Sequence, residues 1–265
     1  MENELLTYGL ALLVGLFLGL TGGGGSILTV PILVYIAKIE PVSATGYSLF
    51  IVGVTSLIGM LSYFKEKLVD IKLAVLFAVP SMISVWLVRH FVIHNLPDTI
   101  LSIGGWSLSK DTAIMFFFAV VMILSSIKMM FFKEQTQGHI QYIDPNFKAA
   151  VIGGIIVGVL SGLIGAGGGF LIVPAITLFM GVPVHLAVGT SLLIIALNSL
   201  VGFTGDFSHL SEINWSYLLE FSLFSSVGVL VGVYLGKKLN PKRLKSVFAW
   251  FVMAVAVVIM FDFFN

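Results

Sequence analysis

The stretch Gly19-Leu20-Thr21-Gly22-Gly23-Gly24-Gly25-Ser26 separates two apolar runs, at about 5–20 and 26–37. A near copy, Gly162-Leu163-Ile164-Gly165-Ala166-Gly167-Gly168-Gly169, separates two further apolar runs. Each glycine within a continuous helix costs roughly 1 kcal/mol relative to alanine. Both stretches therefore predict a break in the chain, with a short helix on either side of it.

The composition around these stretches is that of an integral membrane protein. Of the 265 residues, 58% are hydrophobic and 10% are charged, whereas a soluble domain is roughly 25% charged. The net charge of +1 excludes the dense basic surface that nucleic-acid binding requires. The absence of cysteine excludes disulfides and thiolate metal sites. We therefore expect an all-α membrane protein embedded in a lipid bilayer.

Basic residues in the loops distinguish two arrangements of the broken pairs. Each pair forms either one long span with a broken middle or a re-entrant hairpin of half-helices. Cytoplasmic loops carry the excess of Lys and Arg. With the N-terminus outside, the single-span arrangement places 8 of the 14 basic residues inside and 6 outside. The hairpin arrangement places 11 inside and 3 outside. The hairpin arrangement is predicted, with both termini outside and only Lys38, Arg89 and Lys110 outside among the basic residues.

Six further apolar runs approach the roughly 20 residues that a spanning helix needs. They fall at about 43–63, 71–93, 111–132, 186–204, 215–235 and 246–264.

The chain contains an internal repeat, because a shift of 143 residues produces nine identities rich in glycine, proline and serine. The matched pairs are Gly19/Gly162, Gly22/Gly165, Gly24/Gly167, Gly25/Gly168, Pro31/Pro174, Gly46/Gly189, Ser48/Ser191, Ser56/Ser199 and Gly59/Gly202. The predicted repeats are 1–132 and 149–265, joined by a cytoplasmic linker at 133–148, with 94–110 as an extra loop.

Each repeat would contain one hairpin and three spans. Three crossings place the two repeats in opposite orientations, which is the inverted-topology repeat of many secondary transporters. Such transporters bind substrate near the bilayer midplane, where the broken helices of the two repeats meet. The sequence therefore indicates a site formed by the two glycine stretches.

Helices that begin near Ser26 and Gly169 would present unpaired backbone N–H groups and the positive ends of their dipoles, which bind anions. A phosphate-binding Walker loop would need a lysine beside the glycines, and neither stretch has one. Close helix packing is the alternative interpretation, and it is the one we prefer for Gly15/Gly19, Gly154/Gly158/Gly162 and Gly228/Gly232/Gly236.

The candidate substrate-binding residues are the turns and the polar side chains near them: Thr21, Gly22, Gly23, Gly24, Gly25, Ser26, Ser48, Gly165, Ala166, Gly167, Gly168, Gly169, Thr190, Ser191 and Asn198. For the hydroxyl and amide groups, a bond to a neighbouring helix is the alternative role.

Glu220 and Asp206 are candidates for proton coupling, because an ionisable group within the membrane is by default a functional hypothesis. Solvation at the interface is the alternative role for Glu220. No Lys or Arg falls in the middle of a predicted span, so neutral donors and helix ends are expected to hold the anion. No catalytic or metal-ligand pattern is present, and we expect neither an enzyme nor a bound metal or cofactor.

The two glycine stretches, with Pro31, Pro174 and Gly189-Thr190-Ser191, resemble the TauE/SafE sulfite exporter family, also called the toluene-sulfonate uptake permeases. The resemblance covers essentially the whole chain. It implies transport of sulfite or of organosulfonates such as sulfoacetate across the bacterial plasma membrane, by import or by export. Where the two stretches differ, as at Gly23 against Ala166 and Ser26 against Gly169, the two half-sites cannot be chemically identical.

The sequence therefore predicts a secondary transporter of small sulfur-containing anions that works by alternating access. A passive anion channel and a transporter of a non-sulfur organic anion are the alternatives. A small anionic substrate and the bilayer are the expected partners, nucleic acid is not, and a homodimer is left open.

Overall fold

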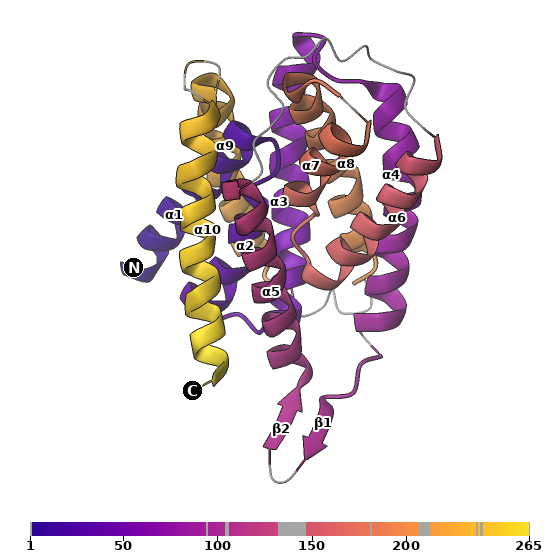
Figure 1. Ribbon diagram of the computed structural model, residues 1–265. Coiled ribbons are helices and arrows are strands. Elements are labelled where there is room, and N and C mark those ends of the chain that lie inside the picture. Colours follow the sequence, from indigo (N-terminus) through magenta and orange to yellow (C-terminus); the bar gives the residue numbers. More distant parts are fainter. Residues whose placement is uncertain are drawn as a thin grey trace.

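The computed structural model describes residues 2–93, 95–103, 106–131, 147–180, 182–206, 213–236, 238 and 241–264, which form a bundle of helices with a small β-hairpin (Figure 1). The elements are α1 (Glu2–Thr21), α2 (Ser26–Pro31), η1 (Ile32–Ile36), α3 (Pro41–Lys65), α4 (Ile71–Leu87), η2 (Val88–Ile93), β1 (Thr99–Ile103), β2 (Trp106–Ser109), α5 (Lys110–Phe131), α6 (Phe147–Ile164), α7 (Gly169–Met180), α8 (Val184–Thr204), α9 (Trp215–Gly236) and α10 (Pro241–Phe264). The two η elements are π-helices. The predicted linker at 133–148 lies outside the described residues, except for its last two, which begin α6.

Long apolar helices dominate the described part of the chain. Six segments are long and apolar enough to cross a membrane: Pro41–Lys65, Ile71–Ile93, Lys110–Ile127, Phe147–Ile164, Leu186–Thr204 and Trp215–Gly236. Their outer faces carry large apolar side chains, such as Leu223, which is 65% exposed. A surface of this kind is stable against lipid and marks a membrane contact. The chain is therefore a multi-pass membrane protein, as its composition predicts.

The chain folds back on itself at each glycine stretch. A Cβ built on Gly25 would lie 2.4 Å from the carbonyl oxygen of Val14, and one built on Gly168 would lie 3.0 Å from Cγ1 of Val157. In a continuous helix, residues eleven apart would be separated by about 16 Å. The pairs α1–α2 and α6–α7 are therefore helical hairpins, although α6 by itself has the length of a span.

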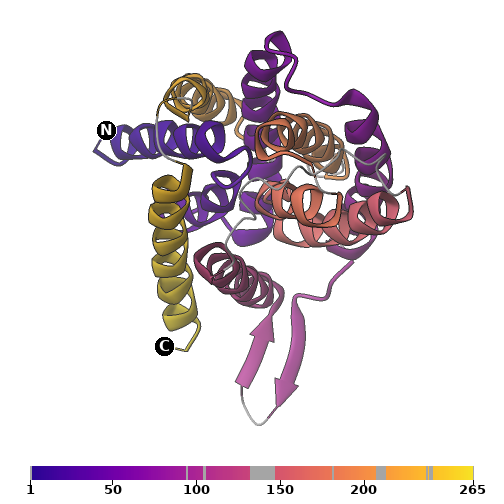
Figure 2. The ribbon, with the colours of Figure 1, turned by 45° about the horizontal axis from the view of Figure 1, so that its top comes forward.

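The helices of the two sequence halves pack against each other in a reciprocal pattern. Helices α3, α7 and α8 occupy the middle of the bundle, with α4 and α6 along one side and α1, α5, α9 and α10 along the other (Figures 1 and 2). The first helix of each half packs on a later helix of the other half, α1 on α9 and α6 on α4. The matched helices α3 and α8 pack on each other. A two-fold relation between the halves would produce this pattern.

Glycines let these helices approach closely. A Cβ on Gly15 would lie 1.8 Å from the carbonyl oxygen of Ser225 on α9, and one on Gly158 would lie 2.4 Å from that of Ser81 on α4. Both distances are too short for any side chain. The small-residue spacing of α1, α6 and α9 is therefore confirmed as a packing feature.

Residues 94–110 include a β-hairpin where we predicted only a loop, so the fold is not purely helical. Strands β1 and β2 pair antiparallel, with Leu101 opposite Leu108. The hairpin projects beyond one end of the helices (Figure 1). An ion pair between Lys110 Nζ and Asp98 Oδ1, 2.7 Å apart, joins the two ends of the hairpin. The short apolar alternation is a weak signal beside the much longer helical runs.

Candidate functional site at the two glycine turns

The two glycine turns begin with the same backbone conformation. Gly22 has φ of +71° and Gly165 has φ of +72°, in the left-handed region that glycine enters without steric cost. Their N–H groups donate to the carbonyls of Leu18 and Ser161, at 2.9 and 2.8 Å. Each glycine thus ends the preceding helix, α1 or α6, in the way that left-handed glycines commonly do. The repeated sequence therefore produces a repeated structure.

Beyond these glycines the two turns are held differently. In the first turn, Thr21 Oγ1 accepts from the N–H of Gly24 at 2.8 Å, and Ser26 Oγ donates to the carbonyl of Gly23 at 2.7 Å. Ile164 and Gly169 occupy the matched positions of the second turn, and the left-handed Gly167 and Gly168 shape it instead. The two turns are therefore held by different groups.

The two turns meet backbone to backbone. A Cβ built on Gly23 would lie 2.4 Å from the carbonyl oxygen of Gly169, and one built on Gly169 would lie 2.7 Å from the Cα of Gly23. Because α2 begins at Ser26 and α7 at Gly169, both helices start beside this contact. The prediction that the two stretches come together is confirmed.

The starts of α2 and α7 differ in their free donors. In α2, the N–H groups of Ser26 and Ile27 donate to the carbonyls of Gly23 and Gly24, at 3.3 and 3.2 Å. In α7 the first backbone N–H group that donates a hydrogen bond is that of Leu171, which donates to the carbonyl of Gly168 at 2.9 Å. Within the described residues, the N–H groups of Gly169 and Phe170 donate no hydrogen bond. The N-terminus of α7 therefore presents more unbonded N–H groups than the N-terminus of α2.

Helices α3 and α8 enclose the turns through reciprocal contacts. Gly22 lies against Val188 of α8, and Gly165 lies against Thr45 of α3, which is the matched residue one repeat earlier. Ser191 Oγ donates to the carbonyl of Gly22 at 2.6 Å. The predicted residue Ser191 therefore joins the second half directly to the first turn.

Several buried polar atoms of α3, α6 and α8 have no hydrogen-bond partner among the described residues. They are the hydroxyl groups of Ser48, Ser56, Ser161 and Ser199 and the amide oxygen of Asn198. Ser199 Oγ would lie 2.4 Å from a Cβ on Gly167, and Ser161 Oγ would lie 3.4 Å from one on Gly168. An unpaired buried polar group costs about 1–3 kcal/mol. A polar ligand at the turns would therefore find the unused hydroxyl donors of Ser161 and Ser199 close by.

Other predicted residues contact different parts of the chain. Thr190 Oγ1 accepts from the backbone N–H of Asp70 at 3.0 Å, in the connection between α3 and α4. The amide nitrogen of Asn198 donates to Ser81 Oγ at 2.6 Å. Ala166 packs in an apolar cluster that includes Phe170. No group of three or more His, Asp or Glu that could hold a metal ion occurs in the described part of the chain.

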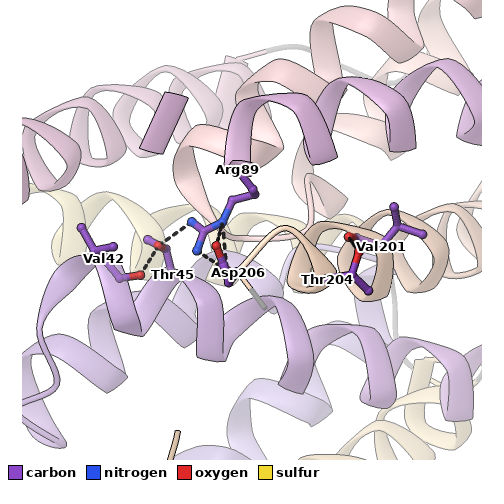
Figure 3. Close-up of polar contacts among 6 residues, drawn as sticks. All are labelled: Val42, Thr45, Arg89, Val201, Thr204 and Asp206. Atoms are coloured by element: carbon purple, nitrogen blue, oxygen red, sulfur yellow. Dashed lines mark hydrogen bonds and ion pairs between the residues drawn. The ribbon is translucent and has the colours of Figure 1, made fainter. Parts of the chain in front are cut away.

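The two acidic candidates have different surroundings. Glu220 is exposed on α9, where its carboxylate accepts from the hydroxyl groups of Tyr8 and Ser216. Asp206 is buried just beyond the end of α8 and forms an ion pair with Arg89 (Figure 3). Of the two, Asp206 is the acidic residue that lies inside the bundle.

Arg89, which we expected in an outside loop, lies inside an apolar segment near its end. It belongs to η2, inside the segment Ile71–Ile93, and is 1% exposed. Its Nε donates to both carboxylate oxygens of Asp206, at 3.0 and 3.1 Å, and its Nη1 donates to Thr45 Oγ1 at 2.8 Å. We counted Arg89 among the outside loop charges because it lies near the end of its run. Its position within an apolar run was the signal available in the sequence.

The apolar helices, the paired broken helices and their meeting point define a membrane protein of the transporter type. The model of the family "Sulfite exporter TauE/SafE" matches residues 7–259, so the chain belongs to this family of membrane transporters. Among similar proteins, a probable membrane transporter protein of Xylella fastidiosa (strain Temecula1) is 29% identical, covering 98% of this chain and 95% of that protein.

Two further relatives extend this similarity to other groups of organisms. The probable membrane transporter protein YunE of Bacillus subtilis is 29% identical over 89% of both chains. A probable membrane transporter protein of Methanocaldococcus jannaschii is 26% identical over 91% of both chains. The similarity therefore extends over nearly the full length of each protein.

Proposed function

We propose that this protein is a secondary transporter of small sulfur-containing anions, sulfite or organosulfonates such as sulfoacetate, and that it works by alternating access. The observation that carries the proposal is the contact between Gly23 and Gly169, where two broken helices from the two halves meet. Matched broken helices of this kind form the substrate sites of many secondary transporters.

The chemistry of the meeting point supports an oxyanion as the substrate. The N-terminus of α7 carries about half a positive charge, and the unbonded N–H groups of Gly169 and Phe170 belong to it. Ser199 adds an unpartnered hydroxyl beside the turn. Such donors stabilise the spread negative charge of a sulfonate or sulfite. The sulfur specificity itself rests on membership of the sulfite exporter TauE/SafE family.

The arrangement in the membrane follows from the loop charges. We place the two repeats in opposite orientations, with the protein in a bacterial plasma membrane and both termini outside. Lys65, Lys67 and Lys72 lie where α3 ends and α4 begins, at the opposite end of α4 from the β-hairpin. The positive-inside rule assigns that lysine-rich end to the cytoplasm.

We propose that the protein transports its substrate without catalysing a reaction on it. Two related functions are the alternatives. A passive anion channel would use the same donors but could not concentrate its substrate. A transporter of a non-sulfur organic anion would recognise a carboxylate with the same helix ends. Both alternatives make different predictions for purified protein.

The decisive experiment is flux into proteoliposomes that contain the purified full-length protein. Sulfite, sulfoacetate and acetate are compared with and without imposed proton and sodium gradients. Saturable, gradient-driven accumulation of a sulfur anion over acetate is expected. Saturable accumulation of acetate alone would favour the non-sulfur alternative, flux that never exceeds equilibrium would favour a channel, and no flux would contradict the proposal.

A further inference from the structure

Arg89 and Asp206 join the two halves of the chain inside the apolar part of the bundle. Arg89 comes from η2 of the first half, and Asp206 follows α8 of the second half (Figure 3). Both residues are buried, at 1% and 6% exposure. A charge within a membrane span is costly, and such residues pair with one another and mark ion or substrate pathways.

The ion pair adjoins the second glycine turn through Thr45. This hydroxyl accepts from Arg89 Nη1 at 2.8 Å and donates to the carbonyl of Val42 at 2.6 Å. The same threonine packs against Gly165, because a Cβ on the glycine would lie 2.3 Å from the Cβ of Thr45. One helical turn further along α3 lies Ser48, whose buried hydroxyl has no partner. A line of polar groups therefore leads from the guanidinium toward the proposed anion site.

Gly46 provides the space for the pair on α3. A Cβ at this position would lie 2.9 Å from Asp206 Oδ2 and 3.1 Å from Arg89 Nη2. The matched glycine of the second half, Gly189, lies against Tyr63 instead. Because Tyr63 is also the residue matched to Asp206, the buried charges occur at only one of the two related positions within the described residues.

We infer that Arg89 and Asp206 form an exchangeable counter-ion pair that couples binding of one monovalent anion to uptake of one proton. On its way to the N-terminus of α7, the incoming anion replaces the Asp206 carboxylate on the guanidinium, and the released carboxylate takes a proton at one of its oxygens. Only one O–H bond forms, and the site is neutral before and after. The inference rests on the proposed transport function and adds its coupling ion and the residue that carries it.

Charge balance is the physical reason for the proton. Two negative groups on one buried guanidinium would leave an unpaired charge in the membrane, which is strongly unfavourable. Of the other elements around the pair, α3 presents the uncharged Thr45 and Gly46. On η2, the ring of His90 stacks on Trp86 at 4.9 Å and the residue is exposed.

Two further carboxylates lie at the ends of neighbouring helices. Glu40 directly precedes α3, and Asp111 lies in the first turn of α5. The hydrogen bonds of Asp206 to the guanidinium single it out from these groups as the one whose charge an arriving anion would replace.

The test measures accumulation of methanesulfonate in proteoliposomes that hold the full-length protein under a one-unit pH gradient. Uptake of sulfoacetate, which carries two charges, is measured beside it to test the proposed function alone. Methanesulfonate keeps a single charge throughout, so one-to-one coupling predicts about tenfold accumulation on the alkaline side, because one pH unit equals about 1.36 kcal/mol. A membrane potential without a pH gradient should drive no accumulation of methanesulfonate. The Asp206→Asn variant should lose the pH-driven accumulation and become sensitive to the potential.

Two variants keep the test decisive. The double variant Arg89→Gln/Asp206→Asn replaces the ions by a neutral hydrogen-bonding pair, so it avoids a lone buried charge if the single variant does not fold. It should also lose pH-driven accumulation. Asp98→Asn removes an aspartate from an exposed ion pair and should retain it.

The outcomes separate the two proposals. Accumulation that persists in Asp206→Asn or in the double variant would overturn the coupling role, as would wild-type flux that ignores the pH gradient. Wild-type protein that moves neither anion would overturn the proposed function for sulfonates, and the coupling with it.

Discussion

Gly165 packs directly on Thr45, and Gly22 packs in the same way on Val188, the residue 143 positions after that threonine. In both contacts a glycine turn of one half rests on the long central helix of the other half. The turns are thus fixed by the opposite half of the chain. Substitutions in this region should therefore affect both halves together.

Replacing Gly165 by alanine should destabilise the protein. The residue has φ of +72°, which costs an L-residue about 1–2 kcal/mol, and its Cβ would lie 2.6 Å from the backbone oxygen of Thr45. Thermal unfolding in detergent should show a lower Tm. Gly9→Ala is the control, because Gly9 is helical with open space around it, and alanine is favoured there by roughly 0.5–1 kcal/mol. Equal Tm values for the two variants would contradict the strained-turn interpretation.

Removing the unpartnered hydroxyl groups at the site should weaken transport without unfolding the protein. Ser48→Ala and Ser199→Ala each delete a buried group that has no hydrogen bond in the structure, so stability should be unchanged or higher. Loss of one hydrogen bond to a charged substrate should raise KM about tenfold. The measurement is concentration-dependent flux together with Tm.

Ser225→Ala is the matched control for these variants. Ser225 is also buried and unpartnered, but its backbone carbonyl faces Gly15 at the contact between α1 and α9. Its removal should leave KM unchanged. If Ser225→Ala raises KM as much as Ser199→Ala does, the hydroxyl at the turn has no special role.

The predicted topology can be examined with single cysteines, because the chain has none of its own. Glu66→Cys lies at the end of α3 and Asn95→Cys lies beyond η2, and both positions are exposed. In intact cells, a membrane-impermeant thiol reagent should label position 95 and leave position 66 unlabelled until the cells are opened. The reverse pattern would invert the proposed orientation.

The base of the β-hairpin should loosen in acid. The Lys110 ammonium hydrogen-bonds Asp98 and lowers the pKa of that carboxyl below its ordinary value of 3.8. The ion pair therefore stabilises the hairpin at pH values above the ordinary pKa of the carboxyl group. This stabilisation is lost as the pH falls through the lowered pKa. Hydrogen exchange at the Lys110 amide, which donates to the Asp98 carbonyl at 3.0 Å, should lose protection there. Asp98→Asn should remove that pH step, and a step that remained would point to another group.

The sequence predicted the parts of this fold that repeat. The shift of 143 residues anticipated the matched turns at Gly22 and Gly165, which share a left-handed backbone, but not the different conformations of Gly24 and Gly25 against Gly167 and Gly168. It did not anticipate the Arg89–Asp206 pair, because these residues are 117 apart and belong to different halves. A repeat reveals what the halves share, and the ion pair lies where they differ.

Helix phase explains which polar residues point to the turns. Thr190 and Ser191 are adjacent on α8 and therefore project about 100° apart, so one bonds to Asp70 and the other to Gly22. The motif Gly189-Thr190-Ser191 contains both residues, and only their helical phase relative to the first turn distinguishes their contacts. That phase depends on how α8 packs on α3, which no local pattern encodes.

The backbone contact between Gly23 and Gly169 has a consequence for engineering substrate choice. Main-chain atoms offer the same donors whatever the neighbouring sequence, and neither position has room for a side chain. Libraries that vary the turns should therefore yield mostly inactive protein. Libraries that vary the faces of α3 and α8 around Ser48 and Ser199 should yield transporters with altered preferences, because those faces can change size and polarity while the turns stay intact.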